Sequence, residues 1–203
     1  MQFKRNMISL ITVVGLLLFI LTANASAQDV EVIYPDFEQA LRQLASLGMD
    51  TALLNNVKVE VYPGEIIAYK QGDKIGMTNC LTVSQINQNT GTIEARITLA
   101  KGADVDMLLH ELGHVVEAKL GSVNGSWVDA NDMGKAYIIM KQYTKELDQA
   151  NQMRLPWYER LSEWFAEDVR QFLAQKISPG YYYKGVGPEK TKEVDEFLEK
   201  LIF

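Results

Sequence analysis

Two histidines and a glutamate stand close together near the middle of the chain, in the run His110-Glu111-Leu112-Gly113-His114. Side chains four residues apart on a helix point to one face, so both imidazoles could bind one zinc ion. Glu111 would be turned about 100° away, where it could take a proton from a zinc-activated water. The pattern is typical of zinc-dependent peptidases, with His110 and His114 as metal ligands and Glu111 as catalytic base. The alternative is a chance meeting of two solvent-exposed histidines.

A third metal ligand is needed, and it must be a carboxylate because the chain contains no other histidine. The best region is Glu159 to Asp168, where Glu159, Glu163 and Glu167 form an i, i+4, i+8 row opposite an apolar stripe. Spacing alone leaves all three glutamates open as ligands. A second carboxylate one turn away could orient a ligating imidazole. An ordinary acidic, solvated helix face is the competing interpretation.

The two histidines need a helix that faces a cleft, and the sequence predicts one over Asp104 to Leu120. An acidic first turn and Gly121 mark its ends, and its apolar stripe lies on the face opposite the histidines. Short runs rich in Val, Ile, Tyr and Thr between Val57 and Leu99 indicate a small, mostly antiparallel sheet. Further helices are expected over Phe37–Leu47, Asp132–Gln149, from Pro156 onward and over Lys190–Leu201. The expected fold class is therefore α+β.

The first 27 residues have the features of a secretory signal peptide. Two basic residues precede an apolar run from Met7 to Thr22, and the small-residue site Ala25-Ser26-Ala27 follows. An uncleaved membrane anchor is the alternative, although the apolar run is short for a span. We expect cleavage, so that residues 28–203 form a single secreted, extracellular domain with no membrane attachment.

The mature chain should be acidic and free of disulfides. Loss of two basic residues with the signal peptide changes the net charge from −6 to −8. This charge argues against nucleic-acid or anionic-membrane partners. Cys80 is the only cysteine, so no intramolecular disulfide can form, and we expect a buried, inert thiol. The sequon Asn124-Gly125-Ser126 is interpreted as a chance match, and the expected oligomeric state is a monomer.

The run Ser162-Glu163-Trp164-Phe165-Ala166-Glu167, downstream of the histidine-bearing segment, resembles the catalytic domain of anthrax-lethal-factor-like zinc peptidases. Secreted Pro-Pro endopeptidases belong to this group, and the resemblance extends from about Thr92 to the C-terminus. It implies a zincin-like domain that binds one Zn²⁺ ion through His110, His114 and Glu163. It also implies that Glu111 is the base and that Glu167 orients a ligating histidine.

The resemblance further implies a tyrosine before the third ligand, whose hydroxyl would stabilise the oxyanion. Tyr158 is the nearest candidate, five residues before Glu163, and the run Tyr181 to Tyr183 offers alternatives. The strand Thr92 to Leu99 would present an exposed edge to an extended polypeptide substrate.

The substrate expected from the resemblance is a proline-rich surface protein cleaved at Pro-Pro bonds. Two other functions compete with this one. The first is a non-catalytic zinc-binding adhesin or inhibitor module on the same scaffold. The second is a zinc peptidase of different specificity, such as one that trims cell-wall peptides.

Overall fold

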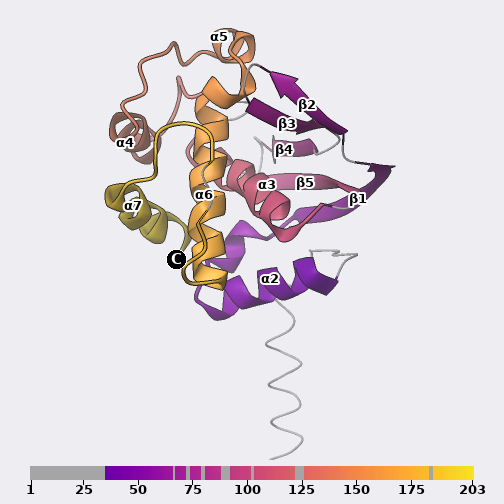
Figure 1. Cartoon of the computed structure of the whole chain (residues 1–203). Helices are drawn as coiled ribbons and strands as arrows, with labels where there is room; N and C mark the ends of the chain where they lie inside the picture. The colour runs from indigo at the N-terminus through magenta and orange to yellow at the C-terminus, as the bar shows by residue number, and fades with distance from the viewer. Residues whose placement is uncertain are drawn as a thin grey trace, which may run out of the picture.

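The computed structural model describes the backbone of residues 35–65, 67–71, 74–78, 81–87, 92–101, 103–121, 126–182 and 185–203 (Figure 1). Its elements are α2 (Pro35–Ser46), η1 (Thr51–Leu53), β1 (Val57–Glu65), β2 (Ile67–Gln71), β3 (Lys74–Thr78), β4 (Leu81–Asn87), β5 (Thr92–Lys101), α3 (Val105–Ala118), α4 (Asp132–Met140), α5 (Gln149–Arg154), η3 (Trp157–Glu159), α6 (Leu161–Ile177) and α7 (Lys192–Ile202). The chain thus combines helices with small sheets, as expected. The predicted signal peptide, Cys80, Tyr183 and most of the sequon lie outside the described residues.

The larger sheet has three strands in the order β1-β5-β4. Strand β5 pairs in parallel with β1 and antiparallel with β4, while β2 and β3 form a separate antiparallel pair. The prediction of a mostly antiparallel sheet is therefore wrong for the pairing of β1 with β5. Turn residues between consecutive strands suggest hairpins, but they carry no information on a pairing between the first and last strands of the segment.

The central position of β5 also corrects the expected substrate edge. Strand β5 pairs with β1 on one side and with β4 on the other, so the backbone of Thr92 to Leu99 already belongs to the sheet. The edges of the three-stranded sheet are β1 and β4. An alternating strand can be central or peripheral, because alternation reports which face is buried and says nothing about the strand's neighbours.

The core lies between this sheet and the long helices. Ala95, Ile97 and Leu99 of β5 are buried in the same cluster as Leu109 and Leu112 of α3. Helix α6 packs against the other side of α3, and α4 and α7 lie beyond α6 (Figure 1). Helix α3 is thus enclosed between the sheet and α6, which limits its movement.

The helical region is more divided than the sequence predicted. Instead of one helix over Asp132–Gln149, α4 ends at Met140 and α5 begins at Gln149. Gln142 has a φ of 50°, which a continuing α-helix does not allow. In the part of the chain that the structure describes, no helix is long and apolar enough to cross a bilayer.

Candidate metal centre

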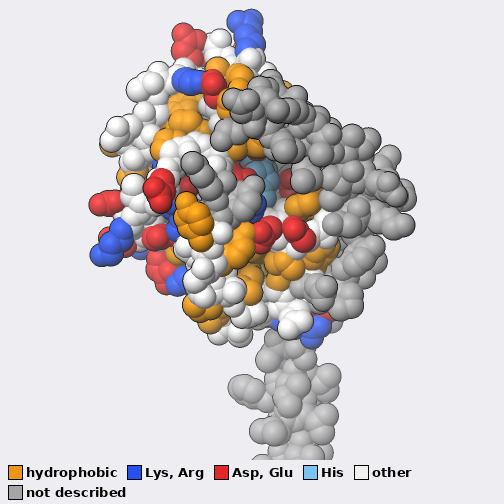
Figure 2. All heavy atoms as spheres, viewed as in Figure 1, with side chains coloured by type: hydrophobic (Ala, Val, Ile, Leu, Met, Phe, Trp, Pro, Cys, Tyr) orange, Lys and Arg blue, Asp and Glu red, His pale blue; other side chains and the backbone are white. Residues whose placement is uncertain are grey.

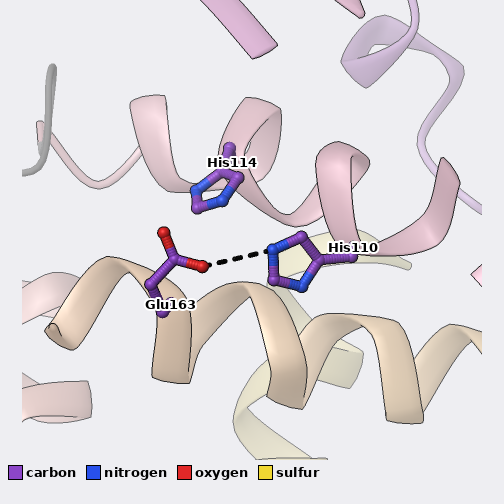
Figure 3. A group of neighbouring side chains, drawn as sticks. All are labelled: His110, His114 and Glu163. Carbon is purple, nitrogen blue, oxygen red and sulfur yellow. Dashed lines mark ion pairs between the residues drawn. The ribbon is translucent and has the colours of Figure 1, made fainter. Parts of the chain in front are cut away.

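Helix α3 holds the two histidines on the face that meets α6. Asp104 caps the helix by accepting a hydrogen bond from the backbone nitrogen of Met107 at 3.0 Å. Leu108, Leu109 and Leu112 anchor the helix in the core. The side chains of His110 and His114 are 18% and 19% exposed, and both point toward Glu163 on α6 (Figure 3). Histidine atoms are visible in a recess of the molecular surface (Figure 2).

A glycine contact between α3 and α6 sets the spacing of this group. A Cβ atom added to Gly113 would lie only 2.6 Å from the Cα atom of Ala166. The two backbones therefore approach closely between the ligand-bearing turns. Because of this approach, an Oε2 atom of Glu163 lies 3.4 Å from Nε2 of His110.

His110, His114 and Glu163 meet the requirements of a zinc site. Each offers one ligand atom, and these atoms all lie within 4.8 Å of one another. Two atoms bound to tetrahedral zinc at about 2.0–2.1 Å would be separated by about 3.3–3.4 Å. The 3.4 Å contact between His110 and Glu163 already matches that separation. Two imidazoles and one carboxylate are ligands typical of catalytic zinc, which keeps a fourth position open.

In each imidazole the second nitrogen, Nδ1, lies close to another carboxylate. Nδ1 of His110 lies 3.1 Å from Oε1 of Glu167, and Nδ1 of His114 lies 3.0 Å from Oε2 of Glu117. A carboxylate at Nδ1 favours a proton there and leaves Nε2 unprotonated for metal binding. The sequence predicted this role for Glu167. It did not identify Glu117, although an acidic residue three positions after a ligating histidine is a signal that could have done so.

The structure distinguishes Glu163 from Glu159, which spacing had left equivalent. Helix α6 begins at Leu161, so Glu159 belongs to the preceding 3₁₀ turn and not to the helical row. The carboxylate of Glu159 pairs with Lys145. Glu163 and Glu167 remain on one face of α6, one turn apart, and each of them contacts His110.

The tyrosines proposed for oxyanion binding occupy different environments. Tyr158 lies in the 3₁₀ turn, where its ring packs edge-on against Trp157 and its carbonyl accepts a hydrogen bond from Trp164 at 2.8 Å. The hydroxyl of Tyr181 donates a hydrogen bond to Asp106. Tyr182 is exposed. These positions leave the role of Tyr158 as a prediction.

The metal-free centre is strongly charged. Burial alone would lower the pKa of His110, but the carboxylates of Glu163 and Glu167 outweigh it and raise the pKa to about 10. Burial would raise the pKa of Glu163, yet contact with His110 and the charge of His114 bring it down to about 2. His114 also has a raised pKa, because Glu117 and Glu163 overcome the opposing effect of burial. The carboxylates thus favour the positively charged form of both imidazoles, and an ion that binds them would displace one proton from each.

Glu111 follows His110 on α3 and is only 7% exposed. Burial raises the pKa of its carboxyl, an effect that the charges of His114 and His110 oppose. A raised pKa makes a carboxylate a stronger base, which accepts a proton more readily. Its environment therefore suits the role of base predicted from the motif.

Three further residues shape the centre without having been predicted. They are Gly113 at the helix crossing, Glu117 behind His114, and Arg170, which pairs with Glu167. Arg170 lies three residues after Glu167, a spacing that suggests a pair on one helix. The close approach of Gly113 to Ala166 has no signal in a single sequence.

Comparison with known proteins gives no match: no protein-family model, curated protein or solved structure matches the chain. The function is therefore inferred from the residues of the site.

Proposed function

We propose that this protein is a zinc-dependent endopeptidase. The observation that carries the proposal is the convergence of His110, His114 and Glu163 beside Glu111, whose buried carboxyl has a raised pKa. The three ligands come from two helices, and the base lies next to the first of them in the chain. A metal site that served only structure would be expected to use a fourth protein ligand. Among the described residues, the group that could hold a metal has three members.

The residues have distinct roles in the proposed reaction. His110, His114 and Glu163 would hold one zinc ion, while Glu167 and Glu117 hold the two imidazoles with Nε2 directed at it. When bound, zinc polarises a carbonyl group and makes water a nucleophile near neutral pH. Glu111 would accept a proton from the attacking water and pass it to the leaving amine. Tyr158 remains our candidate for stabilising the oxyanion.

We further propose that the chain forms a zincin-like domain and acts outside the producing cell as a monomer. Its substrates would be extended, proline-rich polypeptides, and the bonds that it cleaves would be Pro-Pro bonds. Proline fixes φ and lacks a backbone N–H donor, so a Pro-Pro bond requires a shaped subsite. An extended peptide could pair with β4, the edge strand that packs against α3. Protection of amides 81–87 from exchange by a bound peptide inhibitor tests this placement. Unchanged exchange there would refute it.

A non-catalytic binding module on the same scaffold is the second candidate. Such a module would need the metal ligands but would have no use for Glu111 as a base. Retention of Glu111 beside an intact ligand group favours catalysis.

The test is cleavage mapping by mass spectrometry. The chain starting at Gln28 is incubated with peptides rich in Pro-Pro sequences, alongside its Glu111→Gln variant and a chelator-treated sample. We expect cuts by the parent protein alone, between prolines. Cuts at other bonds would support the proposal of a zinc peptidase and refute its specificity for Pro-Pro bonds. Zinc binding without cleavage of these peptides or of unstructured proteins would favour the binding module.

A further inference from the structure

The carboxylate of Glu167 is held from two sides by charged groups. One oxygen, Oε1, lies 3.1 Å from Nδ1 of His110, and the other, Oε2, pairs with Arg170. Arg170 is itself buried. Glu167 is therefore the charged neighbour of Nδ1 of His110, although the two groups are not aligned for a hydrogen bond, and anything that displaces Glu167 changes the surroundings of that ligand.

A glycine closes the third side. A Cβ atom added to Gly185 would lie 2.5 Å from Oε2 of Glu167 and 3.2 Å from its Cβ and Cδ atoms. The φ angle of Gly185 is outside the left-handed region, so its backbone conformation does not require glycine. The requirement is space. Any side chain at position 185 would occupy the volume in which the Glu167 carboxylate lies.

The described residues that follow Gly185 are anchored, which limits an outward movement of its backbone. Gly187 lies against the indole ring of Trp164, where a Cβ would be 2.6 Å from the ring. On one side of Gly185 in the chain, the Tyr181 hydroxyl bonds Asp106 of α3. On the other side, the carbonyl of Pro188 accepts a hydrogen bond from Lys141 at 2.9 Å. A side chain at position 185 would therefore be accommodated by a shift of Glu167.

We propose that Gly185 is a positioning residue of the metal centre. Because it has no side chain, the carboxylate of Glu167 has the space to lie beside Nδ1 of His110. This inference rests on the proposed metal site but concerns a contact that exists without the ion. Residue 185 lies 75 residues from His110 in the chain and 18 from Glu167. It acts on the metal only through Glu167.

The chain offers a direct readout, since His110 and His114 are its only histidines. Imidazole ¹⁵N spectra of the untagged, metal-free protein thus report the two ligands alone. In Gly185→Ala, the His110 signals should shift. The His114 signals should not, because the imidazole of His114 contacts Glu117 and not Glu167. Gly180→Ala is the control for backbone strain without a clash, because Gly180 lies in the same connection between α6 and α7, its φ of 91° disfavours alanine, and nothing lies within 4 Å of its added Cβ. It should leave both sets of signals unchanged.

Metal binding gives the second readout. Cobalt(II) affinity should fall about 10–100-fold in Gly185→Ala, as expected when an outer partner of a ligating histidine is disturbed. Glu167→Ala should cause a similar loss. The double variant should bind no more weakly than Glu167→Ala alone, since two changes that act through one contact are not additive. If Gly185→Ala fails to fold, the double variant should fold again, because the 2.5 Å contact with Oε2 is removed and only the 3.2 Å contact with the Cβ atom of residue 167 remains.

Each outcome has a defined meaning. Unshifted His110 signals in Gly185→Ala, additive losses in the double variant, or failure of the double variant to restore folding would overturn the positioning role. A parent protein that binds no cobalt or zinc would overturn the proposed metal site. The metal-free spectra would still decide the contact between Gly185, Glu167 and His110.

Discussion

The closest approach between the two ligand-bearing helices, at Gly113, gives the sharpest test of how the centre is built. In Gly113→Ala, the new Cβ would lie 2.6 Å from the Cα atom of Ala166. Carbon atoms pack at about 3.5–4.0 Å, so α3 and α6 must separate locally by about 1 Å. Metal–ligand distances tolerate only about 0.2 Å. Glu163 would then no longer reach an ion held by the two histidines.

The expected effects on stability and on metal binding differ. Alanine favours a helix over glycine by about 1 kcal/mol, which partly offsets an overpacking cost of about 1–3 kcal/mol. The net loss of stability should therefore be about 0–2 kcal/mol. Zinc affinity should fall at least about 100-fold, the upper end of what disturbed supporting groups cost. Competition with a fluorescent zinc chelator measures the affinity, and urea unfolding measures the stability.

Gly134→Ala provides the matched control. Gly134 is also helical and lies on α4, away from the ligands. Its added Cβ would lie 2.7 Å from the Cβ atom of Ala130. This variant should lose stability while keeping the parent's zinc affinity. Parental zinc affinity in Gly113→Ala would refute the argument that the helix crossing sets the ligand geometry. Equal losses of affinity in both variants would show a general effect of destabilisation.

Three further outcomes are expected. In the metal-free protein, the pKa of His110 is raised from 6.5 to about 10 and that of Glu163 is lowered from 4.5 to about 2. The stabilisation that these shifts bring is complete between pH 4.5 and 6.5 and is lost as the pH rises toward 10 or falls toward 2. Urea unfolding across this range should show a smaller alkaline loss of stability in His110→Gln than in the parent, because only His114, whose pKa is also raised, remains in the variant; parallel profiles would contradict it. Lys141→Ala should lower the free energy of unfolding by about 3–5 kcal/mol, because the buried carboxylate of Asp168 loses its charged partner at 2.8 Å and keeps only the hydrogen bond from Tyr137. Lys192→Ala, at an exposed pair, should lower it by at most about 0.5 kcal/mol, and similar losses would refute the difference. Glu111→Gln should keep metal affinity while kcat falls about 10²–10⁴-fold, and full activity in this variant would remove Glu111 as the base.

Local patterns predicted the parts of the site that lie on single helices. The apolar stripe and the acidic cap of α3 determine where the helix lies and which way His110 and His114 face. Spacing on α6 likewise placed Glu163 and Glu167 on one face. It wrongly added Glu159 to this row, because a 3₁₀ turn precedes the first turn of α6.

Features that depend on contacts between distant segments could not be predicted. The parallel pairing of β1 with β5 and the approach of Gly185 to Glu167 join residues far apart in the chain. The break at Gln142 is local, but a positive φ angle at a glutamine has no signal in the sequence. A single sequence records propensities and periods, and these do not specify which surfaces meet.

The crossing of α3 and α6 is packed by Leu112, Phe165 and Ala166, all of which are fully or almost fully buried. Apolar contacts between the two helices therefore help to hold His114 and Glu163, which are 49 residues apart in the sequence, near each other. A polypeptide of this design could leave the cell folded and inert. If the chain is the zinc peptidase proposed above, its activity would begin where it first met zinc, so that metal supply would take the place of the removal of a pro-segment.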